Sequence, residues 1–143
     1  MKHYDLVPQE NNIYCVCSTL QAILARHGTG ISQSEIAENL TPTANGFLVG
    51  DNRIKDFLRS RGFDYFHYLH NQTPYEPEYV LNDMDNNDGI IGINTQVNHV
   101  YLLQSFDGSK VKLIDPKDAT IVEREYYELL KQVGFYGLLK RLS

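Results

Sequence analysis

The period of the hydrophobic residues changes midway along the chain, and this change limits the folds that are possible. Over residues 12–61, apolar side chains recur every three or four positions, as they do along the buried face of a helix. Over residues 89–139 they form short runs bounded by turn residues, which is typical of strands. Because helices come first and strands follow, the pattern predicts an α+β fold with N-terminal helices packed on a C-terminal antiparallel sheet.

Individual elements follow from the same pattern and from local start and stop signals. Helices are expected at about 12–27, 32–40, 51–61, 76–84 and 125–131. Extended segments are expected at 65–69, 89–94, 99–106, 110–114 and 135–139, with a loop at 41–50 and a polar turn at 85–89. Asn11 or Asn12 is expected to cap the first helix, and Ser32 to open the second in a capping box with Glu35.

The length, the net charge and the apolar runs of the chain exclude some classes of function. A chain of 143 residues is expected to form one domain over 1–143 that buries a core without disulfides or metal. Its net charge of −5 argues against a nucleic-acid partner, which requires a basic surface. No apolar run approaches about 20 residues, so no membrane span is expected. The N-terminus lacks the apolar stretch of a secretory signal, which predicts a cytoplasmic protein, with export by a signal-independent route as the alternative.

The chain has two cysteines, Cys15 and Cys17, and a helical wheel separates them. Cys17 falls within the apolar stripe of the first helix, formed by Ile13, Val16, Leu20, Ile23, Leu24 and His27. Cys15 falls nearly opposite, beside Ser18, Thr19 and Ala22. We therefore expect Cys17 in the core and Cys15 in the first turn, facing away from that core. A first turn stabilises a thiolate through its free N–H groups and the helix dipole.

Other roles are open to these cysteines. Burial as a small hydrophobic residue is the commonest fate of a lone cysteine. The C-x-C spacing is too short for a redox pair of the C-x-x-C kind. A zinc site would need two more ligands, and the candidates, His67 and His70, lie outside any clear metal frame. No metal or cofactor is therefore expected.

A cysteine nucleophile needs a histidine and a group that orients it. His99 opens a predicted strand, and Asp115 ends the strand that follows it after the turn at Asp107 and Gly108. A two-residue turn would pair Val100 with Asp115 and put His99 on the other face. A three-residue loop, 106–108, would place His99 directly opposite Asp115, and we predict this loop.

Four residues in this order, Gln9, Cys15, His99 and Asp115, resemble the papain-like peptidase domain that processes double-glycine bacteriocin leaders, in its stand-alone form. In that family a glutamine lies six residues before the cysteine, as Gln9 does here. The cysteine opens a helix with the pattern C-G-x-A-x-L, which reads C-V-C-S-T-L here. A histidine opening a strand (H-V-Y-L-L), a hairpin and then Asp115 followed by proline complete the likeness.

The resemblance implies a role for each of these residues. Cys15 would be the nucleophile, His99 the general base and acid, and Asp115 the group that orients His99, while Gln9 would donate to the oxyanion beside the backbone N–H of Cys15. The chain departs from the family at Val16, where a glycine is usual, and at Tyr14, where an acidic residue is frequent. A peptidase acting on a peptide or protein through an acyl-enzyme is the expected function. A papain-like acyltransferase and a non-catalytic peptide- or protein-binding module are the alternatives.

Overall fold

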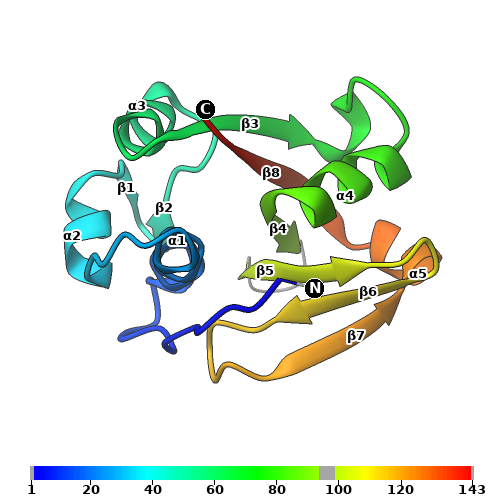
Figure 1. The fold of residues 1–143 in the computed structure, drawn as a ribbon, viewed down its shortest axis with the longest axis horizontal. Helices are drawn as coiled ribbons and strands as arrows, with labels where there is room; N and C mark the ends of the chain where they lie inside the picture. Colours follow the sequence, from blue (N-terminus) through cyan, green and yellow to red (C-terminus); the bar gives the residue numbers. More distant parts are fainter. Residues whose placement is uncertain (1, 94–98, 143) are drawn as a thin grey trace.

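Residues 2–93 and 99–142 of this computed structural model form a strongly twisted sheet with helices on both faces (Figure 1). Six strands pair in the order β3-β8-β4-β5-β6-β7, and every pairing is antiparallel. The strands are β3 (Phe63–Leu69), β4 (Asp88–Ile93), β5 (His99–Phe106), β6 (Lys110–Ile114), β7 (Ile121–Glu125) and β8 (Val133–Arg141). A separate small hairpin joins β1 (Pro42–Thr43) and β2 (Gly46–Phe47).

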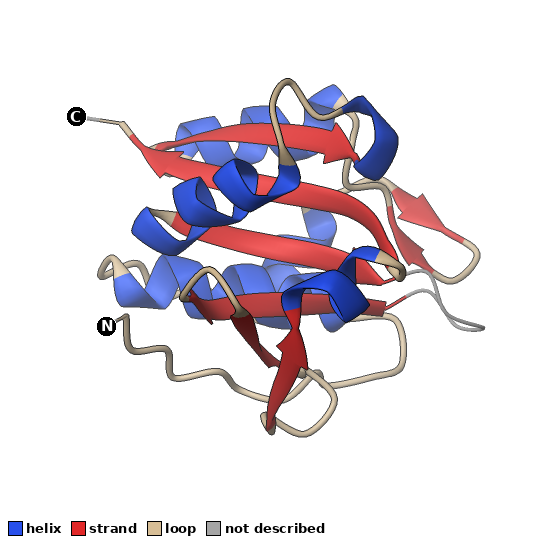
Figure 2. Cartoon of the chain, turned by 90° about the vertical axis from the view of Figure 1, so that its right-hand side faces the viewer, coloured by secondary structure: helices blue, strands red, loops and turns tan. Residues whose placement is uncertain are grey.

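The helices divide between the two faces of the sheet. One face is covered by α1 (Cys15–Arg26), α2 (Gln33–Glu38) and α3 (Asn52–Ser60), the other by α4 (Pro77–Asn86) and α5 (Tyr126–Leu130), with a short 3₁₀ turn η1 (His70–Gln72). Figure 2 shows α4 and α5 in front of the strands, with α1 and α3 behind them. Ile90 and Leu102 belong to the first core, and their chain neighbours Ile91 and Leu103 to the second, as the period of a strand requires. The predicted α+β class is confirmed.

Three features of the predicted element map are wrong. The segment 41–50, expected to be a loop, contains β1 and β2, and β7 was not predicted. Strand β7 reads IVERE and is mostly exposed at the edge of the sheet, so it lacks the apolar alternation that reveals a half-buried strand. The expected polar turn at 85–89 is also wrong, since α4 runs to Asn86 and β4 begins at the buried Asp88. Residue 94, the predicted end of that strand, lies outside the described residues.

Helix α1 begins three residues later than predicted. Asn11 does not cap it: the Asn11 side chain accepts from the N–H of Ile13 (3.1 Å), and its carbonyl accepts from the N–H of Tyr14 (3.3 Å). These bonds form a turn before the helix, and Tyr14 precedes the first helical residue without a side-chain cap. Ile13, assigned to the apolar stripe, lies outside the helix and is 39% exposed. Ser32, by contrast, caps α2 through the N–H of Glu35, as predicted.

The side of α1 that was expected to face away from the core is buried as well. Ser18, Thr19 and Ala22 are at most 1% exposed, because the N-terminal segment and α2 cover the side of α1 that faces away from the sheet. The Ser18 hydroxyl donates to the carbonyl of Val7 (2.6 Å) across this contact. Cys17 is fully buried, which confirms its predicted place in the core.

The β5–β6 hairpin has neither of the turns considered for it. Phe106 pairs with Val111, and the turn covers residues 107–110, with Gly108 at a φ of 96°. The Asp107 carboxylate closes this turn by accepting from the N–H groups of Ser109 (2.9 Å) and Lys110 (2.7 Å). The predicted three-residue loop, with His99 directly opposite Asp115, is therefore wrong.

A bulge at Gln104 restores His99 and Asp115 to the same face of the sheet, which the turn alone would not do. Taken alone, the turn would put His99 opposite residue 118, and an odd separation from Asp115 would leave the two side chains on opposite faces. The bulge shifts the register so that Leu102 pairs with Ile114. His99 and Asp115 are then offset by two residues, which is an even number, so their side chains lie on the same face of the sheet. The Gln104 amide donates to the carbonyl of Lys2 (2.6 Å), which ties the bulge to the N-terminal segment.

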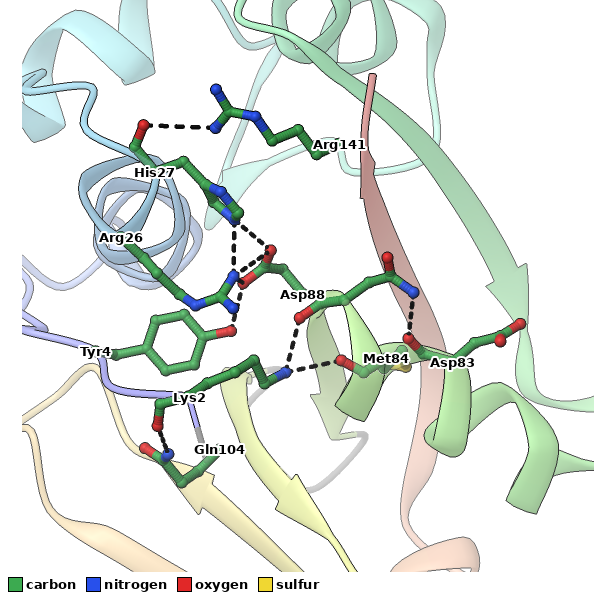
Figure 3. A network of polar contacts seen from close by, with 10 residues as sticks. Lys2, Tyr4, Arg26, His27, Asp83, Met84, Asp88, Gln104 and Arg141 are labelled. Atoms are coloured by element: carbon green, nitrogen blue, oxygen red, sulfur yellow. Dashed lines mark hydrogen bonds and ion pairs between the residues drawn. The ribbon is translucent and has the colours of Figure 1, made fainter. Parts of the chain in front are cut away.

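A buried carboxylate joins the N-terminal segment, the end of α1 and the start of β4 (Figure 3). The Asp88 side chain, 2% exposed, accepts from the Tyr4 hydroxyl and from Arg26 (3.1 Å to each oxygen), and His27 Nε2 lies 2.8 Å from it. Nearby, Lys2 donates to two carbonyls at the end of α4 (2.8 and 2.9 Å). Burial lowers the pKa of Lys2 to about 8, against the opposing pull of Asp88.

Candidate functional site

A cavity of about 220 Å³ opens where the N-terminus of α1 meets the β1–β2 hairpin and the ends of β4 and β5. It is lined by Ile13, Cys15, Val16, Thr43, Asn45, Gly46, Phe47, Val49, Gly92, Ile93, His99, Val100 and Phe135. Most of this lining is apolar, and Cys15 and His99 are the groups in it that can carry out nucleophilic or acid–base chemistry.

Cys15 is the first residue of α1 and is partly exposed at the wall of the cavity. The backbone N–H groups of a first turn have no partner within the helix, and no side chain caps this one. Cys17, two residues further along α1, is enclosed in the core, and burial raises the pKa of its thiol to about 12. The two thiols therefore have different environments, one in a cavity and the other among apolar side chains.

His99 begins β5 and is paired with Asp115. Its Nε2 lies 2.6 Å from Asp115 Oδ1, which leaves Nδ1 as the nitrogen available to Cys15. A side-chain hydrogen bond with Cys15 raises the pKa of His99, the contact with Asp115 raises it further, and partial burial opposes both. The edge of the Tyr101 ring packs against the imidazole, with the ring centroids 4.8 Å apart.

The loop that follows β6 fixes Asp115. Its carboxylate accepts from the N–H of Lys117 (2.9 Å), and its backbone N–H donates to Thr120 (2.9 Å). The N–H of Ala119 donates to the Asp115 carbonyl (2.8 Å), with Ala119 in the left-handed region at a φ of 64°. The structure thus brings Cys15, His99 and Asp115 together from α1, β5 and the β6–β7 loop.

Gln9 is held close by but is not part of this arrangement. Its backbone N–H donates to the carbonyl of Pro116 (2.7 Å), next to Asp115. Its side-chain N–H donates to the carbonyl of Asn11 (2.9 Å), while Oε1 is buried without a hydrogen-bond partner among the described residues. Gln9 neither lines the cavity nor forms a side-chain hydrogen bond with Cys15 in this part of the chain.

Several cavity residues were missed by the sequence reasoning. Phe135 of β8 lies against Gly92 of β4, where an added Cβ would lie 2.1 Å from the ring, so only glycine fits without movement of the ring. The signal for this close approach is a glycine inside a buried strand.

The structure also places the two residues that depart from the family pattern. Tyr14 packs against Phe47 (ring centroids 5.9 Å apart), and Val16 is 2% exposed in the core.

The structure does not gather metal ligands in the residues it describes. Over 2–93 and 99–142, no group of three or more His, Cys, Asp or Glu side chains could hold a metal ion. His70 contacts the Tyr136 hydroxyl (2.8 Å), and His67 packs on Phe135 with ring centroids 4.9 Å apart. Within the same ranges, no helix has both the length and the apolar character needed to cross a bilayer.

Replacing Asp115 with asparagine is expected to lower the pKa of His99. The negative carboxylate stabilises the protonated imidazole, so its removal is expected to shift the titration of His99 to lower pH. An NMR titration of the imidazole C–H signals measures it. Asp118→Asn is the matched control, because Asp118 lies in the same loop and bonds to Thr120 instead. An unchanged His99 titration in Asp115→Asn would show that the carboxylate does not control the imidazole.

Comparison with known proteins establishes the fold. No protein-family model matches the sequence, and no curated protein matches it. Among solved structures, a double-glycine motif protease from an AMS/PCAT transporter, in complex with the leader peptide, is 19% identical with a TM-score of 0.74, covering 98% of this chain and 93% of that one. The peptidase domain of Streptococcus ComA, a bifunctional ABC transporter involved in quorum sensing, is 17% identical with a TM-score of 0.74, covering 97% and 99%. The peptidase domain of Streptococcus mutans ComA, in complex with a small-molecule inhibitor, is 13% identical with a TM-score of 0.54, covering 95% of this chain and 98% of that one. The chain has the fold of these peptidase domains, as its motifs predicted.

Proposed function

We propose that this protein is a cysteine hydrolase that cleaves peptide bonds. The observation that carries the proposal is the shared cavity of Cys15 and His99, with Asp115 on the far nitrogen of the imidazole. The raised pKa of His99 supports it, because this shift favours the imidazolium that pairs with a thiolate.

The chemistry would proceed in two steps. Cys15 passes its thiol proton to His99, its Sγ attacks the carbonyl carbon of the scissile peptide, and the C=O electrons move to the oxygen. When this intermediate collapses, the C–N bond breaks, His99 gives its proton to the leaving amine, and a thioester remains on Cys15. Water then attacks the thioester, passes a proton to His99 and releases the carboxylic acid, which restores the free thiol.

The developing oxyanion requires hydrogen-bond donors at the start of α1. The backbone N–H of Cys15 has no partner within the helix, and we assign it as one donor. Gln9 is proposed as the second donor through its side-chain amide, which has one N–H beyond the bond to Asn11.

The substrate is proposed to be a peptide or protein. The cavity, at about 220 Å³, is smaller than the roughly 300–1,000 Å³ of typical small-molecule sites, and Phe47 and Phe135 are among its walls. It therefore accommodates small side chains beside the scissile bond rather than an enclosed metabolite. The AMS/PCAT protease of the same fold was solved with a leader peptide, which supports a peptide here.

Thiol labelling with iodoacetamide tests the proposal in the folded protein. Cys15 is expected to be alkylated much faster than Cys17, read by mass spectrometry of the digested chain, because Cys15 borders the cavity and Cys17 is fully buried. Cleavage of a peptide library in the same preparation would identify a peptidase, and products joined to an added amine would identify an acyltransferase. Equally slow labelling of both thiols, with no turnover, would contradict an enzyme and leave a binding module.

A further inference from the structure

One buried side chain outside the cavity holds the segment that carries Gln9. Gln33, the first residue of α2, is fully buried. Its Nε2 donates to the carbonyls of Val7 and Pro8 (both 3.1 Å), and its Oε1 accepts from the N–H of Glu10 (2.9 Å). These three contacts lie on both sides of Gln9, so the amide of Gln33 holds the backbone before and after it.

Gln33 is itself fixed by α1. Oε1 of Gln21 also lies 3.0 Å from the Gln33 Nε2, so the two N–H groups of this amide are shared among three acceptors, and the Nε2 of Gln21 donates to the carbonyl of Ile31 (3.0 Å). The polar atoms of the Gln33 amide are therefore all paired, which avoids the cost of burying an unpaired amide. A fully satisfied buried network of this kind has one low-energy arrangement, so it is a rigid support.

The segment that Gln33 holds has no regular structure of its own. Residues 5–9 form neither helix nor strand, so their backbone groups depend on other elements for hydrogen bonds. The second support is the bond from the Gln9 N–H to the Pro116 carbonyl (2.7 Å), beside the carboxylate that pairs with His99. Gln9 is thus fixed from α2 on one side and from the loop carrying Asp115 on the other.

We propose that Gln33 is a positioning residue for the oxyanion donor. It acts through the backbone of residues 7–10, which sets where the Gln9 amide lies relative to Cys15. The proposal rests on the proposed function, because it assumes that Gln9 donates to the oxyanion. Oxyanion donors must be held within about 0.5 Å of their productive position, and a shift of about 1 Å costs on the order of 100-fold in rate.

A double-mutant cycle between Gln33→Met and Gln9→Ala tests this role. Methionine matches the length of glutamine but cannot bond to the segment. In the wild-type background, Gln33→Met is expected to lower kcat about 10- to 100-fold with KM within about twofold, since only a transition-state contact is displaced. In the Gln9→Ala background the same substitution is expected to change kcat less than twofold, because the donor that Gln33 positions is already gone.

Each outcome decides a different question. Multiplicative effects of the two substitutions would overturn the positioning role, because Gln33 would then act independently of Gln9. An unchanged kcat in Gln9→Ala alone would overturn the oxyanion role of Gln9 within the proposed function. The control for lost stability is Ile36→Val, on the same helix and fully buried, which is expected to lower Tm without lowering kcat.

A second variant covers the case in which Gln33→Met does not fold. Gln33→Asn keeps a buried amide but shortens its reach, so it is expected to give a smaller loss of kcat. That loss is also expected to vanish in the Gln9→Ala background, and its persistence there would contradict the proposal. Melting curves of all variants set the assay temperature at which each is folded.

Discussion

Replacing Cys15 with alanine is expected to abolish peptide hydrolysis while leaving the fold unchanged. The substitution removes the proposed nucleophile, and loss of such a group costs on the order of 10⁶ in kcat in enzymes with a nucleophile–histidine–carboxylate arrangement. The thiol lies at a cavity wall, so little packing is lost with it. Steady-state hydrolysis of a fluorogenic peptide and a circular dichroism melt measure the two expectations.

The matched control for this experiment is Cys17→Ala. Cys17 is fully buried two residues further along the same helix, so its loss leaves a small void and lowers the free energy of unfolding by about 1 kcal/mol. Its rate of hydrolysis is expected to stay within a few-fold of the wild-type value. The assignment of the nucleophile would be wrong if Cys17→Ala lost activity and Cys15→Ala kept it.

Replacing Asp88 with asparagine is expected to cause the largest loss of stability. This carboxylate is 2% exposed, pairs with the partly exposed side chain of Arg26 and bonds to Tyr4 and His27 across three segments (Figure 3). Asparagine removes the charge, and hydrogen bonds to a charged group are worth about 1.5–3 kcal/mol each, so a loss of about 3 kcal/mol and roughly 10 °C in Tm is expected. Urea unfolding and calorimetry measure it.

An exposed ion pair provides the control for Asp88. Asp64 pairs with Arg59 at a similar distance, 2.9 Å, but both side chains are substantially exposed, at 38% and 69%. Asp64→Asn is therefore expected to cost less than about 1 kcal/mol. Because the Asp88 cluster lies at the end of α1 away from Cys15, the activity per folded molecule should be unchanged. An Asp88→Asn protein as stable as Asp64→Asn would show that the buried cluster contributes no net stability.

The fold class and the core position of Cys17 could be predicted because they depend on local signals. Apolar periodicity identified α1, and Ser32 with Glu35 marked the start of α2. The proximity of His99 and Asp115 was also predicted, although through the wrong turn. In the predicted register the two residues lie opposite each other, and in the observed register they are offset by two residues. Both offsets are even, so both registers place the two side chains on the same face of the sheet.

The remaining features depend on contacts between distant segments. Asp88 sits in a stretch of polar residues that reads as a turn, and only Tyr4, Arg26 and His27 make its burial possible. Gln33 has no local signal either, since its four partners come from the N-terminal segment and from α1. A single sequence does not reveal which distant backbone groups need a partner, so these supports became visible only in three dimensions.

The Gln104 bulge restricts how this protein can change in length. Inserting or deleting one residue within the paired part of β5 or β6, between His99 and Asp115, would turn the imidazole away from its carboxylate, whereas a change of two residues would keep them on one face. The paired strands can therefore change length only by two residues, or by one residue that creates or removes a bulge. A residue inserted at the tip of the hairpin can instead lengthen the turn and leave the register unchanged.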